Sequence, residues 1–126
     1  MRIMLVDDDS RMRQVLRALL ESAGLTVSHE LGDGVEALAC LQEGASVEVI
    51  ITDCHMPRLD GIAFVAALRA AGNQTPVIML SGEHDSKLII RAIKAGVNNY
   101  VPKPIHPQTL LEKIWQTLGT TTGVAM

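Results

Sequence analysis

Acidic residues stand at two points of the sequence where a run of apolar residues stops. Asp7 and Asp8 follow the aliphatic segment 2–6, and Asp53 follows the β-branched segment 49–52. A continuously apolar run of this length is typical of a strand that is buried on both faces. We therefore expect these carboxylates at the ends of strands. Taken alone, Asp53 would equally suit a residue that begins a turn.

A hydroxyl and an amine occupy equivalent positions further along the chain. Ser81 follows the apolar segment 76–80, and Lys103 follows the short segment 99–101. Gathered carboxylates repel one another unless a cation joins them, and an all-oxygen site of this size favours Mg2+ over Ca2+. A hydroxyl and a lysine beside the ion suit a phosphoryl group, for which Asp53 can be the nucleophile.

Five apolar segments alternate with five amphipathic ones along the chain. We expect strands at 2–6, 27–31, 49–53, 76–80 and 99–101, and helices at about 10–23, 35–43, 59–71, 84–95 and 108–118. This alternation predicts an α/β fold, a flavodoxin-like doubly wound five-stranded parallel sheet of order 2-1-3-4-5 with five helices. Ligands bind such sheets at the carboxyl ends of the strands, so the polar side chains should converge in one crevice.

In two of the expected helices, it matters for function whether the apolar residues face the core or the surface. Val35 stands with Leu38 and Leu41 at the spacing of an inner helix face. The segment 84–95 has an apolar arc wider than one core-facing stripe requires, formed by Leu88, Ile89, Ile90, Ala92 and Ile93. A broad core-facing side is favoured for this helix over a surface that binds a partner.

The composition narrows the functional class. The chain has 126 residues and a net charge of -3, and no cluster of Lys and Arg, so we expect one domain without direct nucleic acid binding. No apolar run approaches the roughly 20 residues of a membrane span, so membrane insertion is not expected. Cys40 and Cys54 lack metal-ligand spacing, and no secretory leader is visible, which favours a cytoplasmic location.

Taken together, these motifs resemble the response-regulator receiver domains of two-component signalling, and the chain is similar in size to the single-domain chemotaxis regulators. The resemblance spans residues 2 to 118, so we expect a receiver domain at 1–118 and a flexible tail or linker remnant at 119–126. The matching residues are Val6-Asp7-Asp8, Asp53 with Met56-Pro57 and Asp60-Gly61, Ser81-Gly82, Ala95-Gly96, Tyr100 and Lys103-Pro104.

The resemblance implies a role for each residue of the crevice. Asp53 would accept a phosphoryl group from a sensor histidine kinase or a histidine phosphotransfer protein, with Mg2+ as the cofactor. Asp8 and Asp53 would bind the ion directly, Asp7 would assist through water, and the main-chain carbonyl of His55 would complete the ligation. Ser81 and Lys103 would contact the phosphoryl oxygens, and the bond between Lys103 and Pro104 would be cis.

The resemblance also implies a switch. Ser81 and Tyr100 would move on phosphorylation and change the face formed by the fourth helix, the fifth strand and the fifth helix, where an unknown downstream protein would bind. The protein would act as a monomer or as a phosphorylation-dependent dimer, and it would be a phosphoacceptor with at most slow self-dephosphorylation, not an enzyme. His55, Gly82 and Glu83 occupy positions that tune dephosphorylation in the family.

Two other functional classes are alternatives, and the second of them shares this fold. A Mg2+ phosphohydrolase that forms an aspartyl phosphate would need an acid two residues beyond Asp53, where His55 stands. A flavin-binding protein would need a Gly-rich or hydroxyl-rich loop after the first strand, which the acidic residues replace. The histidines at 55, 84 and 106 lack the spacing of metal ligands, so we interpret them as residues of loops.

Overall fold

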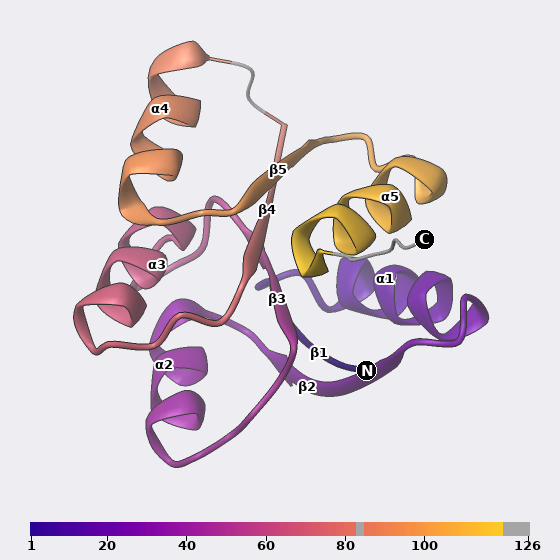
Figure 1. Cartoon of the computed structure of the whole chain (residues 1–126), viewed down its shortest axis with the longest axis horizontal. Helices are drawn as coiled ribbons and strands as arrows, with labels where there is room; N and C mark the ends of the chain where they lie inside the picture. Colours follow the sequence, from indigo (N-terminus) through magenta and orange to yellow (C-terminus); the bar gives the residue numbers. More distant parts are fainter. Residues whose placement is uncertain (83–84, 120–126) are drawn as a thin grey trace.

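The structure of the protein is a computed structural model, and it describes residues 1–82 and 85–119. In these ranges, five parallel strands form one sheet in the order β2-β1-β3-β4-β5 (Figure 1). The sheet confirms the predicted fold class. Glu83, His84 and residues 120–126 lie outside the described residues, and with them most of the predicted tail.

Strands and helices alternate along the whole described chain. The strands are β1 (Arg2–Val6), β2 (Thr26–Leu31), β3 (Val49–Asp53), β4 (Val77–Ser81) and β5 (Asn99–Pro102). The helices are α1 (Ser10–Ser22), α2 (Gly34–Gln42), α3 (Gly61–Ala70), α4 (Ser86–Ala95) and α5 (Pro107–Leu118).

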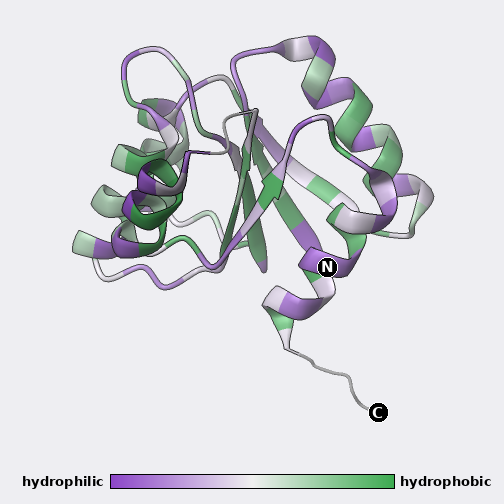
Figure 2. Ribbon diagram, turned by 90° about the horizontal axis from the view of Figure 1, so that it is seen from above, coloured by the Kyte–Doolittle hydropathy of each residue, from purple (hydrophilic) through white to green (hydrophobic). Residues whose placement is uncertain are grey.

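Helices cover both faces of the sheet, α1 and α5 on one and α2, α3 and α4 on the other (Figure 1). The side chains of the strands divide accordingly into two hydrophobic cores, because successive side chains of a strand point to opposite faces. Figure 2 shows the apolar strands between the two helical layers. β3 and β4 are buried at every position, whereas β2 lies at the edge of the sheet and is only partly covered.

Aspartates set the starts of the first four helices. The side chains of Asp9, Asp33, Asp60 and Asp85 accept hydrogen bonds from backbone N–H groups in the first turns of α1, α2, α3 and α4. These N–H groups have no partner within the helix, so a capping carboxylate stabilises its start. α3 and α4 consequently begin two residues later than the predicted starts at 59 and 84.

Two predictions about helix faces are wrong. Val35 is 41% exposed, because α2 turns Gly34, Ala37 and Leu41 toward the core instead. On α4 only Leu88 and Ala92 are buried, and the expected broad core-facing side does not exist. Ile90 and Ile93 are 51% and 62% exposed, since α4 lies at the end of its layer (Figure 1) and packs into the core through Leu88 and Ala92.

The register of the strands brings the predicted polar residues to one edge of the sheet. Val6 pairs with Thr52, so Asp7 and Asp53 stand level at the ends of neighbouring strands. Ser81 pairs with Pro102, which places Lys103 beside the end of β4. No helix in the described part of the chain has the length and apolar character that a membrane crossing needs.

Candidate functional site

Asp53 ends β3 at the centre of the sheet, and its carboxylate is held by two donors. Its Oδ1 accepts a hydrogen bond of 2.9 Å from the backbone N–H of Cys54 and lies 2.9 Å from Nζ of Lys103. The residue is only 9% exposed. A nearly buried carboxylate that two donors hold in place has the properties of a positioned nucleophile.

Three carboxylates gather at this point. Oxygen atoms of Asp7, Asp8 and Asp53 lie within 4.8 Å of one another, with Asp7 and Asp53 buried and Asp8 exposed. Three hard oxygen donors at this spacing match the ligands that Mg2+ prefers, while the exposed side leaves room for water and phosphate oxygens. The structure thus brings together the three predicted carboxylate ligands.

The surroundings of Asp7 indicate which side of the cluster a cation would occupy. Its Oδ1 accepts a hydrogen bond of 2.9 Å from the backbone N–H of Asp9, but Oδ2 is buried and has no hydrogen-bond partner among the described residues. Burial, with a contribution from the negative charge of Asp53, raises the pKa of the Asp7 carboxyl to about 6. A cation beside Oδ2, or a water molecule that the cation binds, would satisfy this oxygen and offset the repulsion, so the residues present fit a divalent ion.

Lys103 reaches Asp53 from the neighbouring side of the crevice. The peptide bond to Pro104 is cis, as predicted. The backbone N–H of Lys103 donates to the carbonyl of Ser81 at 2.8 Å, which ties the end of β5 to the end of β4. The ammonium group is thereby presented to the carboxylate across 50 residues of sequence. A cation here can pair with an added phosphoryl oxygen.

Ser81 and Gly82 form the rim on the β4 side. Ser81 is 1% exposed at the end of the strand, one position beyond Leu80, which pairs with Asp53. A Cβ atom at Gly82 would meet nothing within 4 Å, so the rim is open at this point. Glu83, the third residue of this predicted set, lies outside the described residues.

His55 is exposed in the loop between β3 and α3, directly after the Asp53–Cys54 hydrogen bond. The loop is pinched at its base, because the N–H of Gly61 donates to the carbonyl of Cys54 at 2.8 Å. An ideal Cβ at Gly61 would come within 2.3 Å of the carbonyl oxygen of Asp53. Only glycine permits this approach, which explains the Asp-Gly pair in the sequence.

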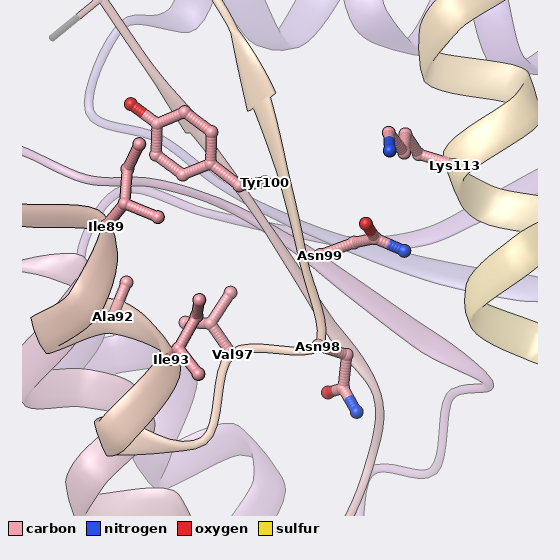
Figure 3. A pocket seen from close by; sticks show the side chains of 8 residues that line it. All are labelled: Ile89, Ala92, Ile93, Val97, Asn98, Asn99, Tyr100 and Lys113. Atoms are coloured by element: carbon pink, nitrogen blue, oxygen red, sulfur yellow. The ribbon is translucent and has the colours of Figure 1, made fainter. Parts of the chain in front are cut away.

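Tyr100 lies away from the carboxylates, on β5 between α4 and α5. Its half-buried ring borders a cavity of about 240 Å³ that α4, β5 and α5 line together (Figure 3). Ile89 and Ile93 line the cavity from α4, and Lys113 lines it from α5 (Figure 3). This is the face that the family resemblance implies as the switch surface.

Two arginines near the site were missed by the sequence analysis. Arg13 of α1 donates from its guanidinium to the main-chain carbonyl of Asp7 and forms an ion pair of 3.4 Å with Glu30. Arg58 of the β3–α3 loop pairs with Asp33 of the β2–α2 turn. Both ion pairs join residues that are far apart in the chain, so no local pattern signals them.

The chain is similar to known proteins along almost its whole length. The model of the response regulator receiver domain family matches residues 3–115. A chemotaxis protein CheY homolog of Campylobacter jejuni is 40% identical over 125 residues, covering 98% of this chain and 96% of the relative. The chemotaxis protein CheY of Pseudomonas aeruginosa is 41% identical over 125 residues, covering 98% and 100%. The structure of Vibrio cholerae chemotaxis protein CheY4 superimposes with a TM-score of 0.85 at 34% identity, covering 93% and 98% of the two chains.

Proposed function

The chain belongs to the response regulator receiver domain family, whose members are signalling phosphoacceptors of two-component systems, and we propose that Asp53 is its phosphoacceptor. The observation that carries this proposal is the environment of the Asp53 carboxylate. It stands at the end of a buried strand, 2.9 Å from the Lys103 ammonium and within 4.8 Å of two further carboxylates. No other aspartate in the described residues combines these features.

The transfer itself needs little more than positioning. An oxygen of the Asp53 carboxylate attacks the phosphorus of a phosphohistidine on a sensor kinase or a histidine phosphotransfer protein. The P–O bond forms as the P–N bond breaks, and the imidazole leaves with the electron pair. Lys103 then pairs with a phosphoryl oxygen, and the Ser81 hydroxyl donates to another. The buried position of Asp53 limits the approach of water to one side.

Asp8, Asp53 and the main-chain carbonyl of His55 are the proposed direct ligands of Mg2+, and Asp7 would assist through water. When bound, the ion neutralises charge on the carboxylates and the transferred group. The unpartnered Oδ2 of Asp7 and the raised pKa of this carboxyl support the assignment. Arg13 keeps the Asp7 backbone in place from the opposite side.

The phosphoryl group adds most of two negative charges beside Ser81, and we propose that the effect reaches the α4–β5–α5 face through Ser81 and Tyr100. The cavity beside Tyr100 supports this route, because it offers the ring space into which it can turn. Ile93 lines this cavity and is 62% exposed, so it supplies apolar surface for a downstream protein on the same face. His55, Gly82 and Glu83 are the residues we propose to set the lifetime of the phosphorylated state.

Incubation of the protein with Mg2+ and a small acyl phosphate tests the phosphoacceptor. Intact-protein mass spectrometry should detect one added phosphoryl group, and Asp53→Asn should abolish it. Asp60→Asn is the matched control, because Asp60 is an exposed aspartate of the same loop and asparagine also caps helices. Persistence of the adduct in Asp53→Asn, or its loss in Asp60→Asn, would reject the assignment.

A further inference from the structure

The loop between β3 and α3 is held at its tip as well as at its base. Residues 54–60 leave Asp53, pass through His55 and return at Gly61. The base is closed by the hydrogen bond from Gly61 to Cys54. At the tip, Arg58 has a φ of 67°, a left-handed conformation that non-glycine residues rarely adopt. A residue stays in such a conformation only when its contacts hold it there.

The contacts of Arg58 are with the start of α2. Its Nε and Nη2 lie 2.8 and 2.5 Å from Oδ2 of Asp33, and Nη2 also lies 3.5 Å from Glu36. The Asp33 carboxylate is nearly buried, with 8% of the side chain exposed. Its other oxygen accepts the N–H of Glu36 and caps α2. One carboxylate therefore fixes both the start of a helix and the tip of the loop.

Close packing accompanies the ion pair. A Cβ atom at Gly34 would come within 2.9 Å of the carbonyl oxygen of Leu59, so the β2–α2 turn and the loop touch through their backbones. The absence of a side chain at Gly34 allows Arg58 to reach Asp33. The loop is consequently fastened to the body of the protein on both sides of His55.

We propose that Arg58 is a positioning residue for the metal site, holding the β3–α3 loop through its ion pair with Asp33 in the conformation that presents the His55 carbonyl. This inference rests on the proposed function, since it concerns the same Mg2+ site. Residues that orient metal ligands from outside the ligand set commonly change metal affinity severalfold or more. A carbonyl ligand has no side-chain freedom, so its position depends on the loop alone.

The direction in which Mg2+ affinity changes when Arg58 is replaced distinguishes a positioning role from a purely electrostatic one. Removing a positive charge near a carboxylate cluster should by itself strengthen Mg2+ binding slightly. If the loop needs the ion pair, Arg58→Asn should instead weaken binding. Asparagine tolerates a positive φ, so this variant removes the guanidinium while keeping the backbone conformation accessible. Arg91→Gln removes the same charge from an exposed position on α4 and measures the effect of the change in net charge.

Isothermal titration calorimetry with Mg2+ alone provides the first readout. We expect Arg58→Asn to raise the dissociation constant about fivefold, as for a binding-competent loop that is populated only part of the time. Arg58→Lys keeps the charge but not the two-point contact, so its dissociation constant should lie between those of Arg58→Asn and the wild type. Arg91→Gln should leave the constant unchanged or lower it.

Amide hydrogen exchange in the metal-free protein provides the second readout. The N–H of Leu59 donates to the carbonyl of Pro57 within the loop, and its exchange should become several times faster in Arg58→Asn. Faster exchange there, together with weaker Mg2+ binding, supports the proposal. An unchanged exchange rate, or Mg2+ binding as tight as in the wild type, overturns it.

Mg2+ binding and phosphorylation of the wild-type protein show whether a negative result rejects the role of Arg58 alone or the metal site as well. If the wild-type protein binds Mg2+ and accepts the phosphoryl group while Arg58→Asn does both equally well, only the role of Arg58 is rejected. If the wild-type protein binds no Mg2+, the metal site and the role of Arg58 are rejected together.

Discussion

Replacing Asp7 by asparagine should make the metal-free protein more stable at neutral pH. Asp7 is 3% exposed, and its Oδ2 has no hydrogen-bond partner in the described part of the chain. Burial, followed among the raising effects by the charge of Asp53, raises the pKa of this carboxyl from 3.8 to about 6. The folded state thus holds the proton more tightly than the unfolded state does, and ionisation opposes folding.

The direction and size of the effect follow from this difference. The contribution of Asp7 to stability is largest below its unfolded pKa, falls as the pH rises from 3.8 and levels off above about 6. At about 1.4 kcal/mol per pH unit the whole loss is about 3 kcal/mol. About 2 kcal/mol of it falls between pH ~4.5 and ~7.5.

Urea unfolding of both proteins in a chelator, at several pH values, measures this contribution. The free energy of unfolding of Asp7→Asn minus that of the wild type should grow by about 2 kcal/mol between pH ~4.5 and ~7.5. Taking the difference cancels every other group that titrates equally in both proteins. Asp8→Asn removes the same charge from an exposed position of the cluster and should gain less.

A difference that stays constant with pH would refute the reasoning, because the folded and unfolded states would then bind the Asp7 proton equally well. Millimolar Mg2+ should act in the opposite direction on the wild type. A ligand that binds only the folded state adds stability, whereas Asp7→Asn should gain much less from the ion. The same measurements therefore also test the part of Asp7 in the metal site.

Two comparisons of stability test the packing. Gly61→Ala should lower the free energy of unfolding by about 3 kcal/mol and abolish phosphorylation of Asp53, because the new Cβ would meet the Asp53 carbonyl at 2.3 Å. Gly82→Ala should keep a free energy of unfolding within about 0.5 kcal/mol of the wild type. Equal urea midpoints for the two variants would contradict this expectation. Ile114→Ala should lose about 3 kcal/mol at a fully buried position, and Ile93→Ala, 62% exposed, less than about 0.5 kcal/mol. A large loss at Ile93 in thermal unfolding would mean that α4 is packed differently.

The sequence by itself determined the sheet and the edge at which most of the candidate site residues gather. Apolar runs of strand length, each followed by a polar residue, predict buried parallel strands, and the rule that such strands end at one edge brings Asp7, Asp53 and Lys103 together. These inferences succeed because burial on both faces leaves a continuous local pattern. The cis bond before Pro104 was implied by the family resemblance and is present.

The tertiary structure decided what depends on distant neighbours. Helical spacing places Val35 and Ile93 among the apolar residues of their helices, but only the packing of α2 and α4 shows that both are substantially exposed. The ion pair between Arg58 and Asp33 spans 25 residues, and only the folded chain shows that Oδ2 of Asp7 is buried without a partner among the described residues. A sequence pattern records the average environment of each residue, whereas charge pairing, exposure and pKa depend on which atoms come within a few ångströms after the chain has folded.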